Sequence, residues 1–279
     1  MKRLIILLII FTCVSVAGVN VFDRFDFLNL GIAPYVQSVG QTGVVSAKGP
    51  ESVYYNPALG AKRSDHSALI GSTLLGYDQQ VSYGYYRFPV AYRGSLLYLG
   101  IVSYQMSGIE LRRSQSAVPD SILNVSQMMF AGGLSRLLSP EVSFGLNVNL
   151  ILDNFSASAP SVLFGAGLAW FPKDDILWGG SLKYLGDGQL ISSLGVESRI
   201  LPQWTVKGQL DIGASDGFFG TQSKYGIDYN INETTAIQMG YHDQMLSLGL
   251  RQSFETWGIQ LSYTDTPIGS RYSVGLELL

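Results

Sequence analysis

Charged residues of both signs recur through the carboxyl-terminal part of the chain, at positions that alternate with apolar residues. They are Lys183, Glu197, Arg199, Lys207, Asp211, Lys224, Asp228, Arg251, Arg271 and Glu277. Alternate side chains of a β-strand point to opposite faces, so these charges share the face opposite the apolar one. Opposite charges on an enclosed face can form ion pairs across the interior that fill and order it. The same charges can instead line a pore and select what passes. Both interpretations stay open.

Residues that could support catalysis or hold a metal ion are sparse. The two histidines are His66 and His242. His242 precedes Asp243 and lies near Ser247, a grouping too loose to define a nucleophile with its base. We interpret His66 as a polar residue at the edge of the first strand. Since no cluster has the spacing of metal ligands, we expect no enzyme, no cofactor and no metal site. The net charge of −3 gives no electrostatic case for nucleic acid.

The alternation that sets the two faces is clearest between residues 257 and 264. One parity holds Trp257, Ile259, Leu261 and Tyr263, and the other holds Gly258, Gln260, Ser262 and Thr264. Repeated in segments of about ten residues, this pattern predicts an all-β chain, a transmembrane antiparallel β-barrel. A soluble sandwich would also alternate, but its outer face would be charged. Only 14% of the residues are charged, against about 25% in typical soluble domains.

Residues 1–17 have the pattern of a secretory signal peptide. Lys2 and Arg3 precede an apolar run that includes Cys13, the one cysteine, and a small-residue cleavage site ends at Ala17. Mean hydropathy is +0.20, yet no later run approaches the roughly 18 apolar residues of a spanning helix. We therefore expect the processed chain to contact lipid in the outer membrane of a Gram-negative-type (diderm) bacterium.

Residues 66–279 contain about fourteen predicted strands, an even number as expected for a bacterial barrel. We expect the sheet to close between the strand near Ile70 and the strand that ends at Leu279. Long connections are predicted at residues 107–122, 153–160, 213–221 and 265–269. All four are odd-numbered connections, so they would lie together at the external end of the barrel.

Residues 18–65 precede the first strand and have no clean period. Their apolar content argues against disorder, and burial inside the barrel as a plug, or hatch, would explain it. Asn56, Pro57 and Ala58 form the most distinctive motif of this segment. We expect Asn56 to cap a short helix that has Pro57 at its first position and runs through Ala61.

The order of motifs resembles the opening of the PorV/PorQ family, which belongs with the FadL-like outer-membrane proteins, the long-chain fatty acid transporters. The resemblance rests on Phe25 to Leu28, then Gly40 to Val45, then Tyr54-Tyr55-Asn56-Pro57-Ala58 followed by a strand. It implies a fourteen-stranded barrel with an amino-terminal hatch that contains the Asn-Pro-Ala motif. The motifs that carry this resemblance lie only within residues 25–61.

Two functions remain open at this stage. In the earlier strands both parities are apolar, as where Leu97, Leu99 and Ile101 alternate with Tyr98 and Val102. An apolar inner face needs an apolar partner, either the plug or a path for hydrophobic small molecules. The alternative, implied by the family resemblance, is a structural or accessory component that contacts secretion-system proteins without transporting anything.

Overall fold

The structure is a computed structural model. It describes residues 31–63, 65–76, 78–90, 94–111, 119, 121–154, 160–184, 190–215, 218–267 and 269–279. The predicted signal peptide (residues 1–17), the first part of the predicted plug (residues 18–30) and the motif from Phe25 to Leu28 lie outside the described residues.

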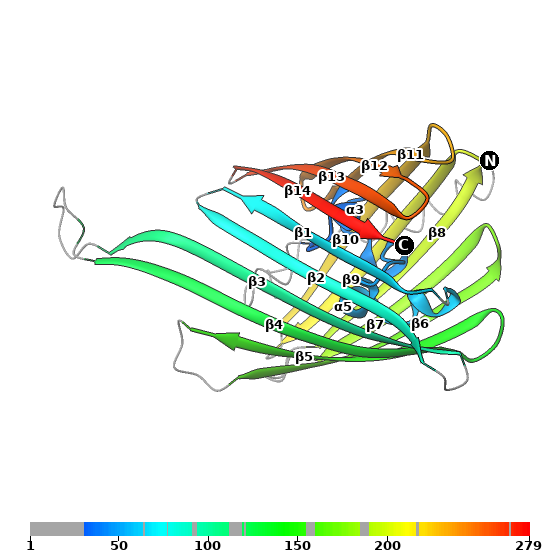
Figure 1. The fold of residues 1–279 in the computed structure, drawn as a ribbon, viewed down its shortest axis with the longest axis horizontal. Coiled ribbons are helices and arrows are strands. Elements are labelled where there is room, and N and C mark those ends of the chain that lie inside the picture. Colours follow the sequence, from blue (N-terminus) through cyan, green and yellow to red (C-terminus); the bar gives the residue numbers. More distant parts are fainter. Residues whose placement is uncertain are drawn as a thin grey trace.

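Fourteen antiparallel strands follow one another around a closed barrel (Figure 1). They are β1 (Ser67–Leu75), β2 (Gln79–Val90), β3 (Ser95–Leu111), β4 (Ser121–Leu137), β5 (Val142–Asp153), β6 (Ser161–Lys173), β7 (Ile176–Tyr184), β8 (Leu190–Leu201), β9 (Trp204–Ser215), β10 (Phe218–Asn230), β11 (Thr235–His242), β12 (Met245–Ser253), β13 (Trp257–Thr266) and β14 (Gly269–Leu278). Strand β1 pairs with β14, with Ile70 opposite Leu276. The predicted closed barrel is therefore confirmed, and closure leaves no sheet edge unpaired.

The two ends of the barrel differ in the length of their connections. Residues 112–120 join β3 to β4 and residues 154–160 join β5 to β6, both at what we call the long-loop end. At the opposite, short-turn end, two to four residues join successive strands. Strands β3 and β4 extend past the rim of the barrel at the long-loop end (Figure 1).

Two of the four predicted long connections are wrong. Strands β9 and β10 continue to residues 216–217, and β13 and β14 continue to residues 267–268. The register runs on without a break, with Ala214 opposite Phe219 and Asp265 opposite Ser270. Both stretches contain aspartate and glycine, which are typical of turns. At the end of a hairpin such residues can still continue the hydrogen-bonded strand pairing, because the partner strand already fixes the register.

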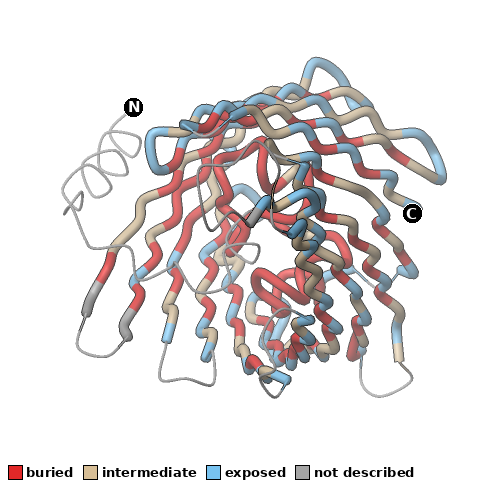
Figure 2. Tube along the Cα trace, turned by 90° about the vertical axis from the view of Figure 1, so that its left-hand side faces the viewer, coloured by how far each residue is buried: buried red, intermediate tan, exposed pale blue. Residues whose placement is uncertain are grey.

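The outer face of the barrel is apolar, and aromatic residues gather at its two ends. Leu261 is 43% exposed while its neighbour Ser262 is 7% exposed, and Figure 2 shows this alternation along the strands. All four tryptophans lie in the strand ends nearest the short-turn end, whereas Tyr184 and Tyr241 lie at the long-loop end. Apolar bands between aromatic girdles are the surface that a lipid bilayer contacts. No helix in the described part of the chain is long and apolar enough to cross a membrane.

Residues 31–63, which we call the lumenal segment, lie inside the barrel (Figure 1). The segment contains α3 (Pro34–Ser38), α4 (Gly43–Ser46), α5 (Ser52–Tyr55) and the 3₁₀ helix η1 (Leu59–Lys62). Helix α3 contacts β11–β14, α4 contacts β7–β9, and α5 with η1 contacts β3–β6. None of these helices is longer than five residues, so their stability comes from packing against the wall rather than from helix propensity.

We expect Leu261→Arg to destabilise the barrel by about 2–4 kcal/mol, because a charge at mid-strand would face lipid. Leu201→Arg, at the short-turn end of β8, is the matched control and should cost about 0–1 kcal/mol. Urea unfolding in lipid vesicles measures the free energy of unfolding of both variants. An equal decrease in the two would contradict the assignment of Leu261 to the lipid-facing side. Ser262→Arg is not a mild control, because the Ser262 hydroxyl donates a hydrogen bond to Gln37 Oε1 at 3.0 Å inside the barrel.

Candidate functional site

The lumenal segment lies so close to the wall that only glycine fits at many inward-facing positions. A Cβ on Gly240 of β11 would lie 1.8 Å from the backbone nitrogen of Gly40, and one on Gly226 of β10 would lie 2.5 Å from the carbonyl oxygen of Val39. Similar approaches to the segment occur on β4, β5, β6, β7, β8 and β12, at Gly133, Gly145, Gly167, Gly179, Gly195 and Gly249. These positions form a belt of glycines around the lumen, and the segment's backbone and side chains occupy the space that wall side chains would otherwise fill.

Asn56 anchors the middle of the segment, in a different way from the predicted helix cap. Its Nδ2 donates to the carbonyl oxygens of Val44 at 2.9 Å and Leu168 at 3.2 Å, which links the segment to β6. Its Oδ1 accepts a hydrogen bond from the Ala58 amide at 3.1 Å, which closes a turn around Pro57. The expected helix from Pro57 to Ala61 is wrong, since only η1 follows and it carries no side-chain cap. Proline and the Asn56 hydrogen bonds stabilise the turn instead.

Gln37 anchors the segment to the strands at which the barrel closes. Its Oε1 accepts hydrogen bonds from Ser262 of β13 at 3.0 Å and Ser273 of β14 at 2.6 Å. Its Nε2 donates to Thr73 of β1 at 3.2 Å. All of these side chains are nearly or fully buried, so their hydrogen bonds have no water to replace them. Gln37 therefore fixes α3 against both sides of the closure.

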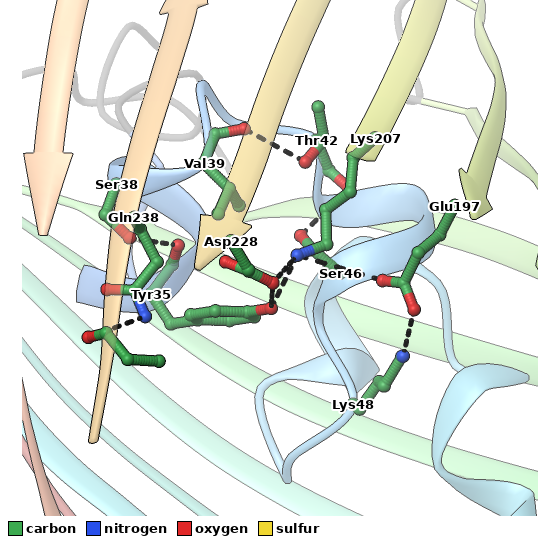
Figure 3. Close-up of polar contacts among 11 residues, drawn as sticks. Tyr35, Ser38, Val39, Thr42, Ser46, Lys48, Glu197, Lys207, Asp228 and Gln238 are labelled. Atoms are coloured by element: carbon green, nitrogen blue, oxygen red, sulfur yellow. Dashed lines mark hydrogen bonds and ion pairs between the residues drawn. The ribbon is translucent and has the colours of Figure 1, made fainter. Parts of the chain in front are cut away.

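An ion-paired network joins the segment to β8, β9 and β10 (Figure 3). The Tyr35 hydroxyl donates to Asp228 Oδ2 at 2.7 Å and accepts from Lys207 Nζ at 2.7 Å. Lys207 also forms an ion pair with Asp228 and lies 3.8 Å from Glu197, which pairs with Lys48 of the segment. Burial raises the pKa of Tyr35, so its hydroxyl keeps the proton that it donates. We call these five residues the latch, because the segment residues Tyr35 and Lys48 both bind to the wall through it.

Most of the other predicted lumenal charges contact neighbouring strands or the segment. Lys224 pairs with Asp211 at 2.7 Å between β10 and β9, and Glu277 accepts a hydrogen bond from Gln260 at 3.0 Å. Lys183 lies over the ring of Tyr54, and Arg251 over that of Tyr35. Arg199 is exposed near the short-turn end, and Arg271 is partly buried. The ion pairs that these charges form join adjacent strands or join the wall to the segment.

The inner face of β2 and β3 packs against the segment in one apolar core. Tyr83, Tyr85, Leu96, Tyr98 and Val102 are all buried in the cluster that includes residues of α3, α4 and α5. The sequence left two partners open for this apolar inner face, the plug or a path for hydrophobic small molecules. At β2 and β3 the partner is the lumenal segment.

Arg87 is a contact that the sequence reasoning missed. Its guanidinium is fully buried, donates to the carbonyl oxygen of Lys48 at 3.1 Å and pairs with Asp65 at 2.6 Å. Arg87 has the same parity as Tyr83 and Tyr85 on β2, so its position in the alternation could have identified it as lumenal. The glycine belt was also missed, although glycines recur on the polar parity of the strands.

Among the described residues, neither histidine is hydrogen-bonded to a serine or a carboxylate. The ring Nδ1 of His66 lies 2.9 Å from the Tyr86 hydroxyl on the exposed side. His242 is buried at the long-loop end of β11, with neither ring nitrogen bonded to a described residue. No group of three or more His, Cys, Asp or Glu that could hold a metal ion occurs among the described residues.

Two cavities lie on opposite sides of the lumenal segment. One, of about 50 Å³, is at the long-loop side and is lined by Lys183, Asp211 and Lys224 together with Tyr54 and Tyr55. The other, of about 220 Å³, is at the short-turn side. It is lined by Lys48, Leu59, Lys62, Arg63, Phe171, Lys173, Asp174, Asp175, Ile176, Leu177, Glu197, Arg199 and Thr205. Both are smaller than the roughly 300–1,000 Å³ of typical ligand pockets.

The fold is that of known outer-membrane channels, although the sequences are distant. The toluene transporter TodX of Pseudomonas putida superimposes with a TM-score of 0.64 at 11% identity, over 88% of this chain and 96% of that one. A FadL homologue of Pseudomonas aeruginosa gives a TM-score of 0.60 at 11% identity, over 88% of this chain and 98% of that one. No family model matches the sequence, and no curated protein matches it. The likeness establishes the fold alone.

Gly240→Ala should displace the lumenal segment, because the added methyl group overlaps the backbone at Gly40. We expect the free energy of unfolding to fall by about 1–3 kcal/mol, which is typical of an overpacked core. A thiol at fully buried Ser46 (Ser46→Cys) should react with a water-soluble maleimide much faster in the Gly240→Ala background. Gly132→Ala on β4 is the control, since nothing lies within 4 Å of its added Cβ. Equal labelling rates in the Gly240→Ala and Gly132→Ala backgrounds would contradict the packing of the lumenal segment against the wall.

The stability of the seated segment should fall as the pH rises. Burial raises the pKa of Glu51 from 4.5 to about 7, and the nearby carboxylate of Glu277 adds to the shift. Because this carboxyl ionises less readily in the folded protein, its contribution is fully present below pH 4.5 and is lost as the pH rises to about 7. Ionisation of Glu51 should lower the free energy of unfolding by about 3 kcal/mol over this pH range, and Glu51→Gln should abolish that decrease. Unfolding at a series of pH values measures it, and an unchanged slope in the variant would refute this role.

Proposed function

We propose that this chain is an outer-membrane β-barrel that binds or passes hydrophobic small molecules, with the lumenal segment as its movable plug. The apolar outer face and the likeness in fold to outer-membrane channels support the location. The neighbour TodX is described as a toluene transporter, which supports small hydrophobic compounds as the class of ligand. The observation that carries the proposal is an apolar stripe on the inner face of β3 and β4.

The stripe leads from the lumenal segment toward the long-loop end. It begins at Val102 and Met129, which face each other across β3 and β4 and are fully buried. The next inward pair, Tyr104 with Gln127, brings polar groups into the stripe, and the Tyr104 hydroxyl donates to Gln79 Oε1 at 3.2 Å. Beyond it Met106 pairs with Val125, and past a bulge Ile109 pairs with Leu123. Paired residues share a face, so these side chains continue the inner face onto the part of the hairpin that projects past the rim (Figure 1).

The inner face of β3 and β4 gives hydrophobic compounds an apolar surface on which they can bind out of contact with water. Burial of apolar area is favourable by roughly 25 cal/mol per Å², so a compound that reaches the projecting hairpin gains free energy by moving along the stripe. The opposite wall, on β9 and β10, carries Lys207, Asp211, Lys224 and Asp228 and offers no such surface. The two sides of the lumen therefore differ, and the apolar side is the proposed path.

Passage requires the plug to shift. The two cavities lie on opposite sides of the lumenal segment and each is small. The latch, Gln37 and Asn56 fix the segment by hydrogen bonds and ion pairs, which are directional and can be exchanged for contacts with water once the segment moves. A local displacement of the segment from β3 and β4 would join the stripe to the short-turn side.

A structural or accessory role in a secretion or anchoring apparatus is the second candidate. The filled, ion-paired lumen favours it, because a protein that transports nothing has no need of an open path. The resemblance of the Tyr54-Tyr55-Asn56-Pro57-Ala58 region to the PorV/PorQ family points in the same direction. In this role the loops and rim of the barrel would bind the partner.

The double variant Met106→Asn and Val125→Asn should lower the uptake of a monoaromatic hydrocarbon into proteoliposomes about tenfold. Both changes replace apolar side chains of the stripe with polar ones and leave the latch intact. Ile122→Asn on the same hairpin is the matched control, since Ile122 is 64% exposed and has the outward parity. Uptake at the rate of protein-free liposomes by the unaltered protein would favour the accessory role. Uptake that all variants support equally would refute the stripe as the path.

A further inference from the structure

The cavity at the long-loop side of the lumenal segment has a wall of buried polar side chains. Gln41 of the segment, Ser181 of β7, Ser193 of β8, and Gln209 and Asp211 of β9 line it, and each is less than a tenth exposed. Buried polar groups of this density are uncommon unless they bind one another, water or a ligand. The cavity lies at the seam between the wall and the segment, because Tyr54 and Tyr55 form its other side.

The charges around the cavity are unbalanced. Two ammonium groups, those of Lys183 and Lys224, face it with one carboxylate, that of Asp211. Asp211 pairs with Lys224 at 2.7 Å and also accepts a hydrogen bond from Gln209 Nε2 at 2.7 Å. Lys183 forms no ion pair with a described residue, and its Nζ lies 4.3 Å from the ring centre of Tyr54 and 5.7 Å from that of Tyr55. Among the described residues, one positive charge is thus left without a counter-charge.

Several hydrogen-bond donors face the cavity beside Lys183. The amides of Gln41 and Gln222 face the cavity, and the hydroxyl of Tyr55 accepts from the amide of Ile32 at 2.6 Å, which leaves its proton to donate. A spherical ion such as chloride would use few of these donors, whereas an oxyanion offers several acceptor oxygens.

The volume sets the size of the ligand. A water molecule needs about 10–15 Å³ of such space, so a cavity of about 50 Å³ holds roughly three to five water-sized atoms. A phosphate, sulfate, bicarbonate or carboxylate group has this number of heavy atoms. We propose that this cavity is a binding site for a small oxyanion, held by Lys183 and the surrounding amide and hydroxyl donors between the wall and the lumenal segment.

Binding at this seam ties the ligand to the position of the segment. The oxyanion would contact β7 through Lys183 and the segment through Gln41 and Tyr55, so it binds the seated arrangement and not the displaced one. A ligand that binds one arrangement raises its stability in proportion to the logarithm of ligand concentration. The inference does not depend on passage of hydrophobic molecules, since the apolar stripe lies on β3 and β4.

The test is thermal unfolding of the full chain in detergent with increasing sodium phosphate, at constant ionic strength set with sodium chloride. The Tm of the unaltered protein should rise with phosphate. Lys183→Gln should need at least tenfold more phosphate for the same rise. Lys173→Gln, the same change at an exposed lysine outside this cavity, should respond like the unaltered protein. If Lys183→Gln does not fold, Gln222→Leu removes one donor and should weaken the response severalfold.

Two further anions identify the source of the oxyanion. Acetate and octanoate present the same carboxylate, so equal effective concentrations assign the site to a free small ion. A response to octanoate at tenfold lower concentration than to acetate assigns it to the charged end of a longer molecule. A Tm that none of the three anions raises, or a phosphate response of Lys183→Gln equal to that of the unaltered protein, overturns the proposal.

Discussion

The backbone of the lumenal segment and the glycines of the wall occupy adjoining space, and the rest of the interior is arranged around that contact. Where Gly240 and Gly226 let the turn at Val39 and Gly40 reach the wall, a Cβ on either wall glycine would overlap the backbone of that turn. The segment consists of short helices that would not persist alone, so the wall determines their positions. Packing at this distance leaves little choice of register between the segment and the strands.

Polar contacts then determine which way the segment is seated. Gln37, Asn56 and the latch bind different parts of the segment to different strands, so a rotation of the segment would leave several buried groups without partners at once. An unpaired buried hydrogen-bonding group costs about 1–3 kcal/mol, and a buried charge that loses its partner about 3–5 kcal/mol. Beyond Val102 and Met129 the apolar side of the lumen carries the pairs of Met106 with Val125 and of Ile109 with Leu123, which are not part of the latch. That difference makes it the side where a ligand can approach without breaking the latch.

The sequence alone predicted the barrel because strand alternation reports local geometry directly. The fourteen strands and the closure of β1 on β14 followed from parity and spacing. The partners of each charge did not follow, because pairing depends on the register between strands and on the position of the segment. Lys207 and Asp228 are 21 residues apart, and only the register of β9 and β10 brings them together. Asn56 was predicted to cap a helix but closes a turn instead, because a cap and a turn use the same side-chain oxygen.

The central claim is that residues 31–63 are packed inside the barrel against its glycine belt. Hydrogen–deuterium exchange of the protein in lipid nanodiscs measures this most directly, through the amides of α3 and of the turn at Gly40. The account predicts that these amides exchange as slowly as amides in the middle of the strands. Exchange of the whole segment at the rate of an unstructured peptide would contradict it.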